Sequence, residues 1–295
     1  MVLDRGHQVR VLIVGGTGVI GSDLKKTLIR NGHDVVITSR QSSAHNDSTL
    51  ALNLENIADS VKTISDAGDF DAVVLSAGVS SIRACRMNPE ATSLVNVDAQ
   101  VAIAKELLSA NSARIILISS NRVFDGSTEL TKIRSTHSPT TEYGRQKAQA
   151  ETELLSLGAS VKIVRFAKVI SEHSELIIDW FNKLSANEKI AAFTDMALSP
   201  ITVGTAVDVI ERVLVTECEP VVQFSAVDEI SFFDLACVIA EYAKSPISNV
   251  IRQLAQDAGD NAIAHSSLES SVFSSIKPTS SLQSVHQIME KITRS

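Results

Sequence analysis

Few residues in this chain could form covalent cross-links or hold a metal ion. Its 295 residues include three cysteines and seven histidines. The cysteines, Cys85, Cys218 and Cys237, are far apart and form no CxxC pair, and the histidines show no HxxxH or HExxH spacing. We therefore expect neither a disulfide framework nor a metal site.

Positive charge and long apolar runs are also scarce. Lysine and arginine number 27 against 34 acidic residues, which gives a formal net charge of −7. Nucleic acid needs a basic face, so it is not expected as the main partner. No apolar run approaches the ~20 residues that cross a bilayer, and residues 1–10 are too short and polar for a signal peptide. We expect a cytoplasmic protein without membrane contact.

The chain does contain a regular alternation of apolar runs and helical patterns up to residue 166. Continuous apolar strands that alternate with helices indicate a parallel sheet with helices on both faces. The predicted strands are 9–14, 35–37, 50–54, 72–75, 114–119 and 161–166. The predicted helices between them are 20–30, 89–110 and 140–157.

The regular alternation of apolar runs and helical patterns ends after residue 166. The predicted elements there are helices 176–184, 203–215 and 232–243, strand 189–193 and a seventh sheet strand, 221–224, before a serine-rich tail. We predict an α/β fold, a doubly wound parallel sheet of Rossmann type with a smaller, interleaved C-terminal lobe. The sheet domain would comprise 1–166 plus 202–224, and the lobe 167–201 plus 225–295.

A glycine-rich segment, VLIVGGTGVIGSDL, joins the first strand to the first helix. In dinucleotide-binding loops, glycines permit a tight turn, close approach of the pyrophosphate and packing of the helix on its strand. The phosphates bind N–H groups at the positive end of the helix. We predict such a site, unless the glycines form a turn without ligand; a P-loop is excluded because no GK[ST] follows. The predicted pyrophosphate-binding residues are Gly15, Gly18, Val19, Ile20 and Gly21.

The end of the second strand indicates which dinucleotide binds. An NAD site usually has Asp or Glu there to accept a hydrogen bond from the ribose 2′-hydroxyl. This chain has Ile37-Thr38-Ser39-Arg40, without a carboxylate. Arg40 could bind a 2′-phosphate with Thr38 and Ser39 as further donors, and the alternative is a solvated arginine. NADP is therefore favoured over NAD.

Small residues follow the fourth strand. Ala77 and Gly78 would let the cofactor approach the backbone, although a plain turn is the alternative. Asn96, within the predicted helix 89–110, could reach the same place or be an ordinary surface amide. Arg83 and Arg86 are expected in a loop, where they could meet an anionic diphosphate.

A tyrosine and a lysine four residues apart begin the helix predicted at 140–157. Tyr143 and Lys147 would share one face of that helix. Ser120 ends a buried strand, and ligands of open parallel sheets bind at the carboxyl ends of their strands. A catalytic group is therefore predicted there, whereas a surface Tyr–Lys pair is the alternative.

The motifs GGTGVIG, ISSNRVFDG and YGRQKAQAE together resemble the extended short-chain dehydrogenase/reductase family. More narrowly, they and TDMALSPITV are similar to its dTDP-4-dehydrorhamnose reductase-like, sugar-nucleotide-binding branch, over roughly residues 9–245. The resemblance implies that Tyr143 is the general acid/base, that Ser120 binds the substrate carbonyl, and that Lys147 lowers the phenol pKa and holds the nicotinamide ribose. It also implies that the C-terminal lobe binds substrate. By the same resemblance, the residues near the adenine are Asn53 and Leu54.

The implied function is NADPH-dependent reduction of a keto group on a nucleotide-activated sugar, of the 4-keto-sugar reductase type. Asn121-Arg122 stands where the branch usually has Asp-Tyr beside the substrate pocket, which disfavours a rhamnose-type substrate. The alternatives are a sugar-nucleotide epimerase and a non-catalytic, NADP-binding regulatory subunit. The chain could also form a homodimer.

Overall fold

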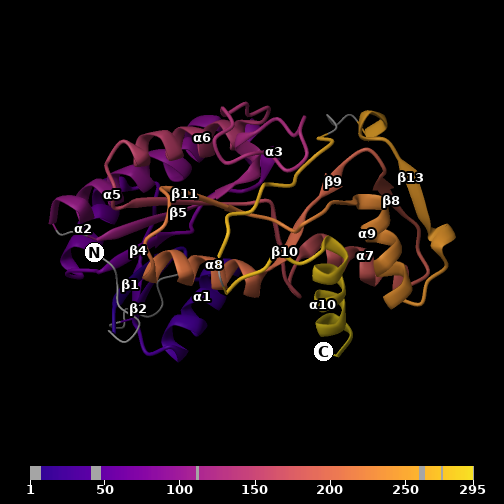
Figure 1. The fold of residues 1–295 in the computed structure, drawn as a ribbon, viewed down its shortest axis with the longest axis horizontal. Helices are drawn as coiled ribbons and strands as arrows, with labels where there is room; N and C mark the ends of the chain where they lie inside the picture. Colours follow the sequence, from indigo (N-terminus) through magenta and orange to yellow (C-terminus); the bar gives the residue numbers. More distant parts are fainter. Residues whose placement is uncertain (1–7, 41–47, 111–112, 259–262, 274, 295) are drawn as a thin grey trace. The chain divides into compact units, whose positions relative to one another are not determined.

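The computed structural model describes residues 8–40, 48–110, 113–258, 263–273 and 275–294 (Figure 1). The chain forms two compact units. The first contains 1–124, 136–165 and 207–222, and the second contains 125–135, 166–206 and 223–295. Among the described residues, none of the helices is long and apolar enough to cross a membrane.

A seven-stranded sheet with the order β11-β6-β5-β4-β1-β2-β3 forms the centre of the first unit. β1 pairs in parallel with β2 and β4, β3 pairs with β2, and β5 pairs with β4. The strand bounds are β1 Arg10–Val14, β2 Asp34–Ser39, β3 Thr49–Ala51, β4 Ala72–Leu75, β5 Arg114–Ser120, β6 Val161–Phe166 and β11 Val221–Phe224. The predicted doubly wound sheet is confirmed, with its change of strand order between β1 and β4.

Helices cover both faces of this sheet. In Figure 1, α2, α5 and α6 lie on one side and α1 and α8 on the other. These helices are α1 Val19–Arg30, α2 Ile57–Asp66, α5 Ala99–Ala110, α6 Glu142–Leu155 and α8 Val203–Val215. Fully buried side chains of strands and helices form one core, among them Leu12, Val73, Ile115, Ile103 and Leu154. This burial explains why the strands have continuous apolar runs.

The segment between β4 and β5 differs from the prediction in two ways. The expected loop around Arg83 and Arg86 contains a short helix, α3 (Ile82–Met87), because the Ser81 hydroxyl accepts from the Ala84 N–H and caps it. The expected helix 89–110 is α4 (Pro89–Ser93), a π-helical turn (Leu94–Asp98) and then α5. Such π-turns often occur at functional sites.

The second unit has three helices around its own apolar core, which includes Trp180, Leu184, Ile239, Ile288 and Met289. Its helices are α7 Glu175–Ser185, α9 Phe232–Tyr242 and α10 Ser281–Arg294. Its three two-stranded sheets pair β10 (Pro200–Thr202) with β7 (Lys168–Ile170), β12 (Ile230–Ser231) with β9 (Ala197–Leu198), and β13 (Val250–Gln253) with β8 (Ile190–Phe193).

Candidate active site

The glycines between β1 and α1 are required by close packing. Gly15 has φ +91°, and a Cβ there would lie 2.6 Å from the backbone nitrogen of Ala77. A Cβ at Gly21 would collide with the Gly15 carbonyl oxygen. Gly16, which the sequence analysis left out, would collide with the Ile37 side chain. A Cβ at Gly18 would meet only the Gly15 oxygen, at 3.4 Å, so this turn is open on one side.

The start of α1 has the properties of an anion site. Gly18 is its N-cap and has no side chain to bond the first N–H groups, and the first turn contains no acid. The N–H groups of Val19, Ile20 and Gly21 precede the first intrahelical donor, Ser22, whose N–H bonds the Gly18 oxygen at 2.8 Å. Free donors at a positive helix end fit a pyrophosphate.

The end of β2 has one buried, one half-buried and one exposed polar side chain. The Thr38 hydroxyl accepts from the Gly15 N–H at 3.0 Å and is buried, so it holds the glycine turn. Its role as a phosphate donor stays a prediction. Ser39 ends the strand, half-buried, and Arg40 follows it with an exposed side chain.

Asn96 lies in the π-helical turn and holds the loop after β4. Its amide oxygen accepts from the Val79 N–H at 2.7 Å, and its amide nitrogen donates to the Val79 oxygen at 3.0 Å and to Gln146 Oε1 at 2.8 Å. A Cβ at Gly78 would lie 2.9 Å from Asn96 Oδ1. Asn96 is therefore buried, not a surface amide, and connects this loop to α6. Gln146 was missed because a polar residue at one helical position carries no distinctive signal.

The turn before α2 contains the residues expected near the adenine. Asn53 is exposed, and its side-chain oxygen accepts from the Glu55 N–H at 3.1 Å, which forms a tight turn. Leu54 is buried in the core.

Ser120, Tyr143 and Lys147 come together at the carboxyl end of β5. Thr141 caps α6 by accepting from the Gly144 N–H at 3.1 Å, which starts the helix just before Tyr143. Lys147, one turn later, donates to the Ile118 carbonyl at 2.6 Å. Burial raises the pKa of Tyr143, whereas its hydrogen bond with Ser120 acts in the opposite direction. The arrangement can place a phenol and a hydroxyl at one substrate oxygen.

Beyond Lys147, the next turn of α6 carries a buried glutamate that the sequence analysis missed. Burial lowers the pKa of Lys147 to about 8, and the Glu151 carboxylate acts in the opposite direction. Glu151 is itself bound by Arg165, His137 and Ser119. Its spacing of four residues from Lys147 was the available signal.

Comparisons with known proteins show which proteins the chain is similar to. A family model described as RmlD substrate binding domain matches residues 9–286. The probable low-salt glycan biosynthesis reductase Agl14 of Haloferax volcanii is 27% identical over 65% of this chain and 66% of its own length. Methionine adenosyltransferase 2 subunit beta of Bos taurus is 26% identical over 82% of this chain and 74% of its own.

A solved structure is similar over nearly the whole fold. It is that of dTDP-4-dehydrorhamnose reductase from Bacillus anthracis in complex with NADP, with a TM-score of 0.85 and 18% identity. The match covers 97% of this chain and 100% of that one. At this identity the likeness establishes the fold.

Proposed function

The chain belongs to the RmlD substrate binding domain family, and from that premise we propose that it is an NADPH-dependent reductase of a keto group on a nucleotide-activated sugar. The observation that carries the proposal is the meeting of Ser120, Tyr143 and Lys147 at the sheet edge where ligands of this fold bind. Residues 1–166 plus 202–224 would bind the dinucleotide. Residues 167–201 plus 225–295 would bind the substrate.

The residues present fit NADP. The uncapped start of α1 would take the pyrophosphate through Gly18, Val19, Ile20 and Gly21, and Gly15 keeps the turn close to β4. The remaining contacts would come from Ser39 and Arg40 at the 2′-phosphate, Asn53 and Leu54 near the adenine, and Ala77 and Gly78 along the β4 loop. Asn96 would act through that loop, because its amide is already bonded to Val79.

NADPH, when bound, would supply a hydride for the carbonyl carbon. Tyr143 would donate a proton to the carbonyl oxygen, and the hydride and the proton together would convert the ketone to an alcohol. Ser120 hydrogen-bonds the same oxygen, and Lys147 would favour the phenolate that remains on Tyr143.

A second candidate is a non-catalytic role as a subunit of a larger enzyme. It is favoured by the similarity to a protein whose name describes it as a beta subunit. An epimerase would use the same residues without net consumption of NADPH. A reductase would consume NADPH, an epimerase would retain the cofactor without net consumption, and a non-catalytic subunit would only bind it.

The test is a screen of nucleotide-sugar ketones for NADPH oxidation, followed by substitution of Tyr143. Tyr143→Phe should lower turnover by about 10²–10⁴-fold, because it removes the proton donor, and should leave NADPH binding unchanged. Tyr242→Phe is the matched control, since Tyr242 is the other of the two tyrosines and lies in the second unit. Normal turnover of Tyr143→Phe would remove the phenol from the mechanism.

Arg40→Ala tests the choice of cofactor. Loss of a charge-assisted contact should weaken NADPH binding by about 10–100-fold and leave NADH binding nearly unchanged. Arg30→Ala, which removes an exposed charge at the end of α1, is the control. Equal losses for both cofactors in a binding titration would contradict a 2′-phosphate contact.

A further inference from the structure

Arg122 brings a positive charge to the candidate active site, and none of the residues that the structure describes pairs it with an opposite charge. It lies in the 3₁₀ turn Asn121–Val123 directly after β5, and its N–H donates to the Ser120 hydroxyl at 3.2 Å. Guanidinium Nη1 is closed off from solvent and has no hydrogen-bond partner among the described residues. Within the same described part of the chain, Arg122 forms no ion pair.

The turn that carries Arg122 packs against the start of α6. A Cβ at Gly144 would collide with the Arg122 carbonyl oxygen, so Arg122 lies beside the residue that follows Tyr143. Burial lowers the pKa of Arg122, and the guanidinium charge and the Tyr143 phenol influence each other. The guanidinium is therefore close to the proposed proton donor.

The neighbouring acids on α6 are engaged elsewhere. Glu142 accepts from Arg145 at 2.9 Å and from Gln146 at 3.2 Å. Glu151 is bound by Arg165 at 2.6 Å. Neither carboxylate is committed to Arg122.

Arg122 is half-buried, and its Nη1 is the guanidinium nitrogen that is closed off from solvent without an acceptor. Such a donor is costly, and arginine does not escape the cost by losing its proton. Its planar fork matches a carboxylate or phosphate, which can accept two parallel hydrogen bonds. A ligand oxyanion would supply both the missing charge and the missing acceptor.

We infer that Arg122 forms an oxyanion-binding position within the active site, which receives a carboxylate or phosphate group of the substrate beside the keto group held by Ser120. The inference rests on the proposed function and narrows its substrate class to anionic sugars, or to sugars whose diphosphate reaches this place. A rhamnose-type sugar has no acid group, so in that case the oxyanion bound by Arg122 would be the diphosphate.

The test is calorimetric titration of the full-length, NADP-loaded protein with UDP-glucuronate, UDP-glucose, glucuronate and inorganic phosphate. Arg122→Met removes the charge at similar length and should weaken the oxyanion probes that bind the wild type by about 10–100-fold. Arg122→Lys keeps the charge but not the fork and should recover part of the affinity. Arg145→Met, which removes the exposed partner of Glu142, is the matched control and should bind as wild type does.

The probes separate the two sources of the oxyanion. If Arg122→Met weakens UDP-glucuronate but not UDP-glucose, the ligand group is the carboxylate. If it weakens both equally, the group is the diphosphate. The inference is overturned if the wild type binds none of the four probes, or if Arg122→Met binds them all unchanged while NADP binding shows that it is folded.

Binding does not require turnover, so this outcome is independent of the proposed reaction. A protein that binds the oxyanion through Arg122 but never oxidises NADPH would retain the site and lose the reductase. If the protein reduces neutral ketones and substitution of Arg122 changes neither binding nor turnover, the proposed reaction stands and the oxyanion site does not.

Discussion

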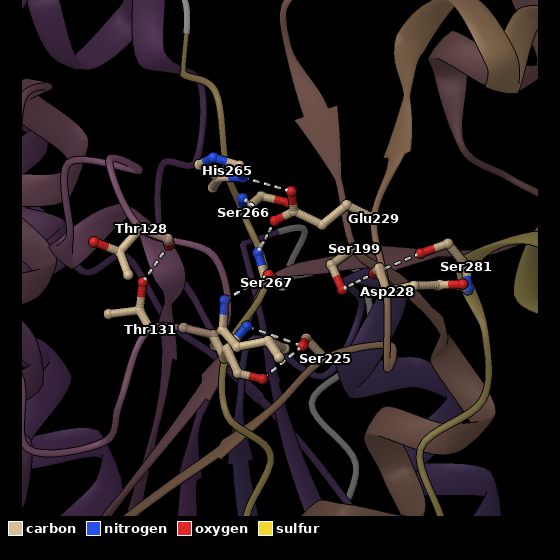
Figure 2. A network of polar contacts seen from close by, with 12 residues as sticks. Thr128, Thr131, Ser199, Ser225, Asp228, Glu229, His265, Ser266, Ser267 and Ser281 are labelled. Carbon is tan, nitrogen blue, oxygen red and sulfur yellow. Dashed lines mark hydrogen bonds and ion pairs between the residues drawn. The ribbon is translucent and has the colours of Figure 1, made fainter.

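Two glutamates, a buried one in the first unit and a half-buried one in the second, each contact a histidine but stabilise different kinds of structure. Glu151 accepts from Arg165 at 2.6 Å and contacts His137 at 3.0 Å. Glu229 accepts from the N–H groups of Ser266 and Ser267, both at 2.7 Å, and contacts His265 at 2.9 Å (Figure 2). One carboxylate is neutralised by a cation, the other by backbone dipoles.

The difference follows the structure around each glutamate. Glu151 joins α6 to β5 through the Ser119 hydroxyl and to β6 through Arg165, so it connects regular elements. Glu229 holds the serine-rich segment 263–273, which has no helix. Farther along, that segment is bonded by the Ser225 hydroxyl, which accepts from the Leu268 N–H at 3.0 Å. In the first unit a charge pair connects helix and strands, whereas in the segment 263–273 hydrogen bonds from the Ser266, Ser267 and Leu268 N–H groups hold a stretch without a helix.

The largest expected effect is at the first glutamate. Glu151→Gln leaves the Arg165 guanidinium buried without its counter-charge, which should lower the free energy of unfolding by about 3–5 kcal/mol. Urea denaturation of the first unit within the intact chain would measure it. Glu153→Gln, two residues away on α6 and outside this network, is the control and should change stability by less than about 0.5 kcal/mol. A loss at Glu151 no greater than the control's would mean that the pair is not a stabilising unit.

A smaller effect is expected at the second glutamate. Both serine N–H groups donate to the same oxygen, Oε1, which Glu229→Gln retains as its amide oxygen. The change removes the negative charge and the Oε2 acceptor that contacts His265, so the loss should be about 1–3 kcal/mol. Because the Ser266 and Ser267 N–H groups donate directly to Glu229, their hydrogen exchange should accelerate more than exchange in the two-stranded sheets of the second unit. Glu241→Gln, an exposed change on α9, is the control. Equal acceleration in the two-stranded sheets of the second unit would show that Glu229 supports the whole of that unit.

The comparison also explains how far the sequence could predict the fold. Apolar strands such as 72–75 were predicted correctly because burial on both faces leaves an unbroken apolar run. The segment 263–273 was not predicted, since hydroxyl and backbone hydrogen bonds leave no periodic pattern. α10 was missed although Val285, Ile288 and Met289 recur at helical spacing, because they follow a serine-rich stretch that continues into the first turn of the helix.

The candidate site shows the same division. The glycine loop and the residues Ser120, Tyr143 and Lys147 were identified because local motifs carry them. Glu151 and Gln146 were missed because their partners, Arg165 and Asn96, are distant in sequence. Arg122 was noted only as a departure from the family pattern, and its lack of an acidic partner required coordinates.

The smallest expected effect is the pH dependence of the stability difference between wild type and the two glutamine variants. Burial by itself would raise the pKa of each carboxyl. Hydrogen bonds and charge lower both pKa values instead. The pKa of Glu151 is lowered by His137, Arg165 and Ser119, and that of Glu229 by Ser267, His265 and Ser266. A pKa lowered by folding gives stability that is complete above the ordinary glutamate value, near ~4.3, and is lost as the pH falls through the folded value.

A glutamine does not titrate in this range, whereas a protonated glutamate resembles it. The stability gap between wild type and either glutamine variant should therefore narrow as the pH falls from about pH 5 through the ordinary glutamate pKa. Urea midpoints across that range measure the gap, and the two exposed controls should show little narrowing. A stability gap that widens on acidification would mean that the folded protein raises the pKa of that glutamate. The ionised carboxylate at that site would then not be stabilised by its cation or backbone dipoles as we describe.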